Sequence, residues 1–408
     1  MQSLREFYKV GPGPSSSHTM GPQRAAKKFK EKYPDASKYI VTLYGSLSLT
    51  GKGHLTDWII LETLKGTPTE IKWVDEELPN HPNGMIFQAF DENDKELDSW
   101  TIYSVGGGSI EIEGFDDDNA PQDIYELNKL DDIYTYIQEK NISLVDYVKE
   151  VEGEDIQEFL EFIVQEMLNN AQRGLDTTGM IPGDLKLIRV AQKINKAGLS
   201  SDTKEEKHRL LVSSYAYAVS EENASGGLVV TAPTCGASGV MPAIMYYYHH
   251  DLGFSIEKLA QSLAVAGVFG NLIKQNASIS GAEGGCQAEV GTACSMAAAA
   301  VSYLDGLNLS QIEYAAEIAI EHHLGLTCDP VFGYVQIPCI ERNGQAALRA
   351  LDAALYAKAL GEFRTNSISF DTVVNVMRET GNDLNHIYRE TALGGLAINY
   401  IKNNKLEK

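Results

Sequence analysis

The sequence predicts a two-part molecule, with an α/β N-terminal domain followed by an all-α C-terminal domain. Residues 39–112 hold four segments rich in β-branched and aromatic residues, separated by Gly, Pro, Asn and Asp, which is typical of strands. Farther along, four long segments repeat apolar residues close to the 3.6-residue period of a helix. A chain of 408 residues has room for two or three domains at roughly 150 residues each.

The N-terminal domain is expected to begin with one helix and to continue as a sheet. The helix starts near Thr19 or Gly21, has Pro22 in its first turn, where the missing N–H costs nothing, and ends before Pro34. The helix carries a basic cluster of Lys27, Lys28, Lys30 and Lys32. We interpret this cluster as the solvent-exposed face of the helix rather than as a nucleic-acid site. The expected strands lie in YIVTLYGSLSL, TEIKWV, GMIFQAF and SWTIYSV.

The connection between the domains is expected near residues 114–124, GFDDDNAPQDI, where Gly, Pro and an acidic run indicate a surface segment. Sequence places element edges poorly, so the boundary can lie up to about 20 residues later. We assign the domains to residues 1–135 and 136–408. The second domain is expected to hold helices in IQEFLEFIVQEML, SIEKLAQSLAVAGVFGNLI, SQIEYAAEIAIEHHLG and GQAALRALDAALYAKALG. Three loops interrupt them, around 223–242, 279–287 and 325–343.

Composition excludes several classes of protein. Hydrophobic residues make up 43% and charged residues 22%, so the chain can bury a large core. Lys and Arg total 34 against 56 Asp and Glu, and this net charge of -22 opposes binding to nucleic acid. The longest uncharged stretch, from Asn223 to Tyr248, contains two prolines and does not fit the roughly 20 apolar residues of a membrane span. Five cysteines and no apolar leader predict a protein of the reducing cytoplasm.

The loop GPGPSSSHTMGP concentrates hydroxyl groups and one imidazole directly before the first helix. Its polar residues are Ser15, Ser16, Ser17, His18 and Thr19. Backbone N–H groups, the helix dipole and these side chains suit a small anion such as a carboxylate. A flexible Ser-rich terminus with an N-cap has the same composition, but the flanking prolines favour an ordered loop.

The segment YGSLSLTGKGHLTD predicts a strand that breaks at Gly51 and Gly53 and then presents His54. An imidazole has an ordinary pKa of about 6.5, which suits proton transfer at neutral pH. A single histidine is more often structural, so both interpretations remain open from spacing alone.

Three of the five cysteines could form a metal site. Cys286 follows a glycine pair at the expected start of a helix, where the dipole favours the thiolate. Cys328 and Cys339 bracket TCDPVFGYVQIPC, whose prolines can shape a ligand loop. Cys294, in ACSMAAAA, is expected to be a packed and inert thiol. The chain has no C-x-x-C pair, so a structural zinc site is not indicated. The alternative to a metal site is that these three cysteines are buried structural thiols.

Eight blocks of the chain resemble the iron-sulfur-dependent L-serine dehydratases, also called L-serine ammonia-lyases, with both half-enzymes in one polypeptide. They are GPGPSSSHTMGP, GSLSLTGKGHLTD, YSVGGG, EENASGG, VVTAPTCGASGVMPA, NASISGAEGGCQAEVGTACSMAAA, HHLGLTCDPV and QIPCIERN. The resemblance implies an N-terminal β domain of a regulatory, small-molecule-binding type and a helical α domain holding a [4Fe-4S] cluster. It also implies the cluster ligands Cys286, Cys328 and Cys339, leaving one iron without a thiolate.

The same resemblance implies a reaction. The open iron acts as a Lewis acid on L-serine, a base removes the α-proton, and the aminoacrylate product becomes pyruvate and ammonia, in serine catabolism that feeds gluconeogenesis. His54 is expected to be the base, with His18 as the second candidate. The residues expected to bind the substrate are Ser15, Ser16, Ser17, His18, Thr19, Thr234, Asn276, Ser278 and Ser280. We expect no pyridoxal phosphate, no nucleic-acid or membrane partner, and a homodimer, the commonest assembly.

The chain departs from the family pattern at three places. Many relatives have a cysteine shortly after the GGLA block, whereas this chain continues GGLAINYIKNNKLEK. Phe332 stands where a small residue is expected. Cys235 replaces an expected Asn in APTCG, and is interpreted as a buried loop thiol or an alternative ligand.

Other functions compete with this one. A pyridoxal-phosphate dehydratase would need a Schiff-base lysine and a phosphate loop, for which SVGGGS is weak evidence. A cluster-dependent hydratase could act on a different hydroxy acid, although no paired arginines for extra carboxylates are evident. A serine or redox sensor would bind serine without turnover.

Overall fold

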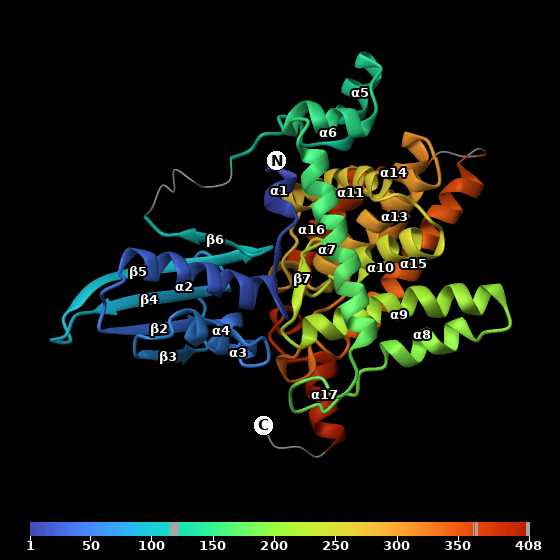
Figure 1. The fold of residues 1–408 in the computed structure, drawn as a ribbon. Helices are drawn as coiled ribbons and strands as arrows, with labels where there is room; N and C mark the ends of the chain where they lie inside the picture. The colour runs from blue at the N-terminus through green and yellow to red at the C-terminus, as the bar shows by residue number, and fades with distance from the viewer. Residues whose placement is uncertain (115–121, 362, 364–365, 405–408) are drawn as a thin grey trace.

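The protein divides into a sheet domain and a helical domain, as the sequence predicts (Figure 1). The computed structural model describes residues 1–114, 122–361, 363 and 366–404. Part of the expected connection, residues 115–121, therefore lies outside the described residues. The division at residues 135 and 136 stays a prediction.

One five-stranded sheet, in the order β3-β2-β4-β5-β6, forms the sheet domain. Its strands are β2 (Lys38–Tyr44), β3 (Thr69–Val74), β4 (Gly84–Phe90), β5 (Glu96–Gly106) and β6 (Ser109–Ile112). β2 and β3 run parallel and the other neighbours run antiparallel. Val41, Phe87 and Trp100 are aligned across three strands and point into one core, because alternate residues of a strand share a face.

Two helices, α2 (Gly21–Lys32) and α4 (Thr56–Thr63), cover this apolar face of the sheet (Figure 1). Phe29 of α2 packs against Phe87 and Trp100, with ring centroids 5.5 and 5.1 Å away. The bounds of α2 confirm the predicted first helix, including Pro22 in its first turn.

The predicted extension of the first strand through GSLSL is wrong. β2 ends at Tyr44, and Ser46–Thr50 form a short helix, α3. Gly45 has a φ of +52°, which is rare for other residues, and its carbonyl accepts the N–H groups of Ser48 and Leu49. The alternation of Ser and Leu imitates a strand, but the turn at Gly45 rotates the chain into a helix that carries it toward His54.

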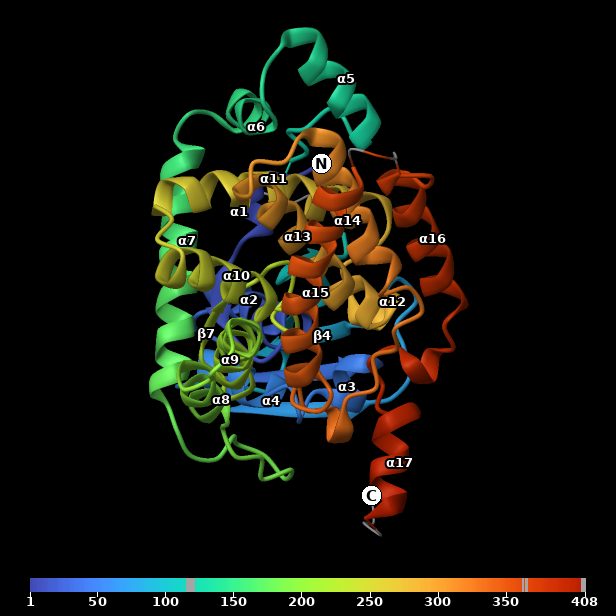
Figure 2. The same cartoon turned by 90° about the vertical axis from the view of Figure 1, so that its right-hand side faces the viewer.

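The second domain is helical apart from one short strand, β7 (Leu228–Val230), and is built around α13 (Thr292–Leu304), almost all of whose residues are buried (Figure 2). Small side chains let α11 (Ile256–Asn276), α14 (Leu309–Glu321) and α15 (Cys339–Leu360) pack around it. α7 (Ile156–Asp176), α11, α14 and α15 confirm the four predicted helices. The other helices are α5 (Leu130–Lys140), α6 (Leu144–Glu152), α8 (Ala191–Leu199), α9 (Lys204–Ala224), α10 (Val240–Tyr246), α12 (Gly281–Gly284), α16 (Phe370–Asp383) and α17 (Gly395–Asn403).

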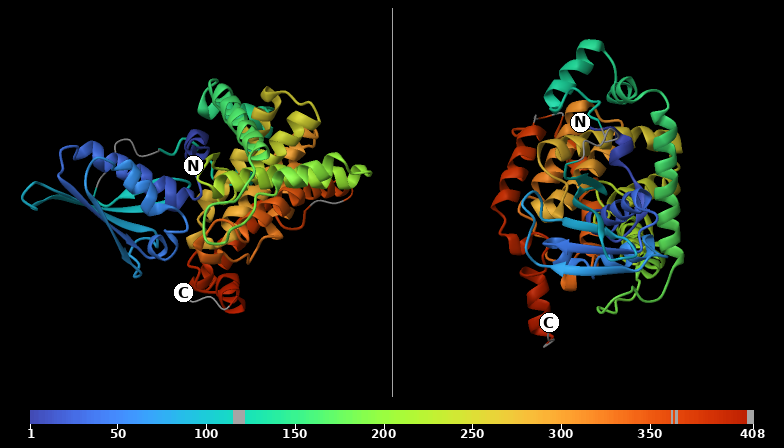
Figure 3. Two further views of the ribbon diagram at one scale, coloured as in Figure 1. Left: turned by 60° about the horizontal axis from the view of Figure 1, so that its bottom comes forward. Right: turned by 90° about the vertical axis from the view of Figure 1, so that its left-hand side faces the viewer.

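The first residues of the chain belong to the core of the helical domain rather than to the sheet (Figure 3). α1 (Leu4–Phe7) packs on α11, and β1 (Val10–Pro12) pairs antiparallel with β7 (Leu228–Val230). The Tyr8 hydroxyl donates to the Leu263 carbonyl at 2.9 Å. The loop that follows is therefore anchored in one domain before α2 enters the other. None of the described helices is long and apolar enough to cross a membrane.

The close crossing of α7 and α9 provides a test of this packing. A Cβ at Gly174 would lie 2.2 Å from the Ala218 carbonyl oxygen, so the helices would have to separate. We expect Gly174→Ala to lower the free energy of unfolding by roughly 1–3 kcal/mol, measured by denaturant titration. The exposed control Gln165→Ala, on the same helix, should change it by less than about 0.5 kcal/mol, and equal effects of the two changes would contradict the packing.

Candidate active site

An enclosed cavity of about 20 Å³ lies where the two domains meet. Its wall contains the side chains of all three predicted ligand cysteines, together with Ser15 and His54 of the N-terminal domain and two glutamates, Glu289 and Glu390. The volume admits about one water molecule, so water is largely excluded from these groups.

The three cysteines come from different parts of the helical domain. Cys286 directly precedes a π-helical turn, Gln287–Gly291, while Cys328 lies in a loop and Cys339 begins α15. All three are buried free thiols, which face the same cavity. The Sγ atoms of Cys286 and Cys328 and a carboxylate oxygen of Glu289 lie within 4.8 Å of one another. Convergent buried thiols are the donor set of iron-sulfur clusters and other thiophilic metals.

A partly buried arginine supports negative charge at these sulfurs. A hydrogen bond with Cys328 and the nearby Arg342 guanidinium lower the pKa of Cys286 to about 7. The hydrogen bond with Cys286 raises the pKa of Cys328, and burial raises that of Cys339. Arg342 donates to the Thr327 carbonyl at 2.6 Å, which holds the guanidinium beside the cysteine loop.

His54 is positioned to accept a proton. Its Nδ1 lies 2.9 Å from the Thr50 carbonyl, and since a carbonyl only accepts, Nδ1 carries the hydrogen and Nε2 keeps its lone pair. Burial lowers the pKa of His54 to about 4, so the ring is neutral at pH 7. Nε2 lies 3.5 Å from Oε1 of Glu390.

His18 lies beside His54 with both ring nitrogens engaged. Nδ1 lies 2.8 Å from Ser17 Oγ and Nε2 lies 3.1 Å from Ser46 Oγ, and the two histidine rings are 4.4 Å apart. Burial and the neighbouring His54 lower the pKa of His18 well below its usual value. With both nitrogens bonded, His18 is better placed to orient His54 than to accept a proton.

The Ser-rich loop is buried and tied to both domains. Thr19 Oγ1 donates to the His54 carbonyl at 2.7 Å, and Thr56 Oγ1 donates to the His18 carbonyl at 2.6 Å. Asn223 Nδ2 of α9 donates to the Pro14 carbonyl at 2.8 Å. Ser15–Thr19 therefore hold both histidines in place, and of these five residues Ser15 lines the cavity.

Two family models match consecutive parts of the chain. The model described as serine dehydratase beta chain matches residues 3–73, and the one described as serine dehydratase alpha chain matches residues 74–397. The chain belongs to the serine dehydratase family. Both parts are joined in one polypeptide, and the protein is an enzyme of the lyase class.

Curated relatives are similar over nearly their whole length. L-serine dehydratases 2 and 1 of Escherichia coli (strain K12) are each 40% identical over 98% of this chain and 99% of their own. L-serine dehydratase of Haemophilus influenzae is 39% identical over 99% of this chain and all of its own.

Three polar side chains at or beside the cavity of this serine dehydratase, Glu289, Arg342 and Glu390, are not among the residues predicted from the sequence. Glu289 lies three residues after Cys286, and Arg342 lies three residues after Cys339, each one helical turn away; this spacing was the available signal. Glu390 had no such signal, because it reaches the cavity from a loop after α16. Its N–H donates to the Cys328 carbonyl at 2.8 Å, and its carbonyl accepts from Ser46 Oγ at 2.9 Å.

The remaining predicted contact residues lie at different distances from the cavity. Thr234 adjoins it, since its hydroxyl donates to Glu289 at 2.8 Å. Ser280 is buried nearby in the chain before α12, whereas Ser278 lines a separate outer cavity. Asn276 lies apart from these groups at the end of α11, where it donates to the Asn128 carbonyl at 2.7 Å.

The other two cysteines do not line the cavity. Cys235 Sγ lies 3.4 Å from Met20 Sδ, and burial raises its pKa far above the usual value. Cys294 is buried in α13, and burial raises its pKa to about 12. Both have the character of packed thiols. This agrees with the expectation for Cys294 and with the interpretation of Cys235 as a buried loop thiol.

The C-terminal helix α17 packs on the cysteine loop without contributing a thiol. The Leu396 N–H donates to Asp329 Oδ2 at 2.5 Å, and Phe332 packs against Tyr400 with ring centroids 5.9 Å apart. Phe332, unexpected at this position, has a φ of +55° and fills space beneath the helix. The last residues, 405–408, lie outside the described residues.

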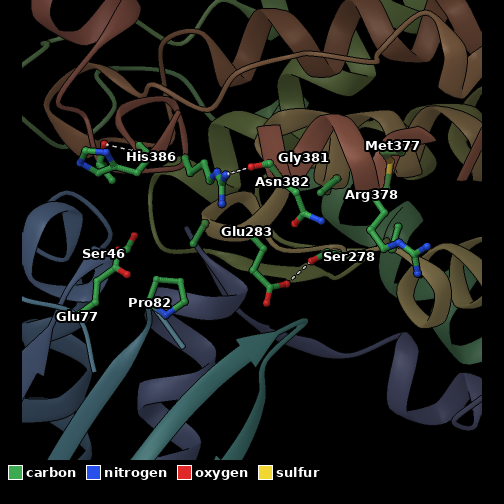
Figure 4. Close-up of a pocket in the computed structure, with 16 residues that line it drawn as sticks. Ser46, Glu77, Pro82, Ser278, Glu283, Met377, Arg378, Gly381, Asn382 and His386 are labelled. Carbon is green, nitrogen blue, oxygen red and sulfur yellow. Dashed lines mark hydrogen bonds between the residues drawn. The ribbon is translucent and has the colours of Figure 1, made fainter. Parts of the chain in front are cut away.

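An outer cavity of about 410 Å³ opens between the domains on the far side of Ser46 (Figure 4). Glu77 and Pro82 of the sheet domain face Arg378 and Asn382 of α16 across it. Ser46 lines this space and also bonds both His18 and the Glu390 carbonyl. Ser46 therefore connects the lining of the outer cavity to His18 and Glu390.

The influence of Arg342 on the cysteines can be measured by titrating the thiols. The Cys286 thiolate should form as pH rises through about 7, followed by its ultraviolet absorbance. In Arg342→Met the midpoint should move to higher pH, because the stabilising cation is gone. Cys294→Ala is the matched control and should leave the midpoint unchanged; an unchanged midpoint in Arg342→Met would contradict this role.

Proposed function

We propose that the enzyme converts L-serine to pyruvate and ammonia and that Cys286, Cys328 and Cys339 hold a [4Fe-4S] cluster. The observation that carries the proposal is the convergence of three buried free thiols and a neutral histidine on one enclosed cavity. The printed names of the relatives support the substrate. When bound, the cluster supplies one iron without a protein thiolate, a Lewis acid for the hydroxyl and carboxylate of the substrate.

His54 is the proposed base. Its Nε2 keeps a lone pair and takes the proton from Cα, while the electrons of that bond form the Cα–Cβ double bond. The Cβ–O bond breaks with its electron pair on oxygen, and the hydroxide takes up a proton and leaves as water. The resulting imidazolium lies 3.5 Å from Glu390 Oε1, which stabilises its charge. The released aminoacrylate tautomerises to an imine and takes up water to give pyruvate and ammonia.

The other residues prepare the site for this step. His18 and the hydroxyls of Ser17 and Ser46 fix the ring beside His54, so that little reorganisation accompanies proton transfer. Ser15 is the proposed hydroxyl contact to the substrate. Exclusion of water strengthens these interactions, and we propose that the substrate enters from the outer cavity past Ser46.

Its setting in the cell is also proposed. The acidic composition and the lack of a disulfide framework support a cytoplasmic enzyme without nucleic-acid partners, and twofold assembly is the default for such a chain. We propose a homodimer that acts in serine catabolism and supplies pyruvate for gluconeogenesis.

Anaerobic reconstitution with iron and sulfide tests the function. The loaded protein should release pyruvate from L-serine without added pyridoxal phosphate, as measured by a coupled assay. Cys328→Ser should lose the cluster spectrum and the activity, whereas Cys294→Ser, a buried thiol outside the cavity, should keep both. An intact cluster with no pyruvate would overturn the proposal and leave a sensor or a different hydroxy-acid substrate.

The assignment of the base is tested by comparing the two histidines. We expect His54→Gln to lower kcat by on the order of 10²–10⁴-fold with the cluster retained, because the proton acceptor is removed. His18→Asn should lower kcat less, since it disturbs only the orientation of His54. A greater loss in His18→Asn, at equal cluster content, would transfer the role to His18.

A further inference from the structure

Glu289 and Glu390 place two carboxylates in the wall of one enclosed cavity. Among the described residues neither forms an ion pair with a lysine or arginine, and Oε2 of Glu390 is buried without a hydrogen-bond partner. Burying a carboxylate without a cation is costly, so this arrangement calls for a cationic group that is not part of the chain.

The two carboxylates approach each other beside the backbone of Gly281. A Cβ on Gly281 would lie 2.8 Å from Oε2 of Glu289 and 3.2 Å from Oε2 of Glu390. Both oxygens therefore flank the same point and lie within about 6 Å of each other. An ammonium group forms charge-assisted hydrogen bonds of roughly 2.7–2.9 Å, so one such group can reach both oxygens.

The two carboxylates are oriented by their other contacts. The Thr234 hydroxyl donates to Oε1 of Glu289 at 2.8 Å, which leaves Oε2 on the side of Gly281. Oε1 of Glu390 faces His18 and His54 at 3.7 and 3.5 Å, which leaves its Oε2 on the same side. The Oε2 atoms of the two carboxylates thus lie close together, and Oε1 of Glu390 lies next to the proposed base.

We propose that Glu289 and Glu390 bind the α-ammonium group of the substrate and thereby select an amino acid over the corresponding hydroxy acid. The inference rests on the proposed function and names the groups that determine its substrate class. An α-hydroxyl in the same place carries no charge and offers one hydrogen, so it cannot satisfy both carboxylates. Glu390 has two tasks, with Oε1 directed at the histidines and Oε2 at the ammonium group.

The test uses two ligands that cannot eliminate water and differ only at the α-position, L-alanine and L-lactate. Their dissociation constants are measured by calorimetry on anaerobic, cluster-loaded protein. The parent should bind alanine more tightly than lactate. Glu289→Gln and Glu390→Gln should each reduce this preference by roughly tenfold to a hundredfold, because each removes a charged hydrogen-bond acceptor. Glu390→Asp should restore part of it.

Two further variants locate the effect. Glu283→Gln removes a carboxylate from the same short helix as Gly281, but one that faces the outer cavity, and should leave the preference unchanged. Gly281→Ala keeps both carboxylates, but its Cβ would displace both Oε2 atoms, so it should weaken alanine binding. An unaltered cluster spectrum in each variant verifies that the site has folded.

The outcomes separate this inference from the proposed function. An equal preference for alanine in the parent, Glu289→Gln and Glu390→Gln would overturn the ammonium site, even if the parent makes pyruvate. If both variants lose the preference for alanine and the parent makes no pyruvate from serine, the ammonium site is supported and only the catalytic function is overturned. With an active parent, Glu289→Gln should raise KM for serine more than it lowers kcat, because the ammonium contact is the same in ground and transition states.

Discussion

The anchoring of the N-terminal loop between the two domains is the constraint on which the site depends. β1 pairs with β7, Asn223 holds the Pro14 carbonyl, and the hydroxyls of Thr19 and Thr56 cross-link the backbones of His54 and His18. The cysteines belong to the helical domain and the histidines to the sheet domain, so neither domain holds a complete site. The proposed base and the proposed ligand cysteines become neighbours only because this loop is buried in both.

Burial then sets the chemistry of each group. It keeps His54 neutral at pH 7 and so able to accept a proton, whereas Cys286 retains thiolate character because Arg342 and Cys328 oppose the effect of burial. The same dry environment makes the two glutamates costly unless a cation lies between them. A cavity with these properties favours a small substrate that carries its own positive charge.

Much of this organisation was predictable from the sequence, for identifiable reasons. Helical periodicity located α7, α11, α14 and α15, and the glycine and proline content of the loops indicated where Cys286, Cys328 and Cys339 lie. The failures arose where local pattern and tertiary contacts disagree. The alternating Ser and Leu residues after Gly45 imitate a strand, and Glu390 is distant in sequence from every group that it faces. Its role depends on the folded loop after α16, which no local pattern encodes.

The central claim is that three thiolates leave one iron of the cluster accessible to a substrate next to His54. The most direct measurement is Mössbauer spectroscopy of protein reconstituted with enriched iron, with and without L-serine. The account predicts that the signal of one iron site changes when serine is added and that the other sites keep theirs. A spectrum that serine leaves unchanged, in protein that releases pyruvate, would contradict the account.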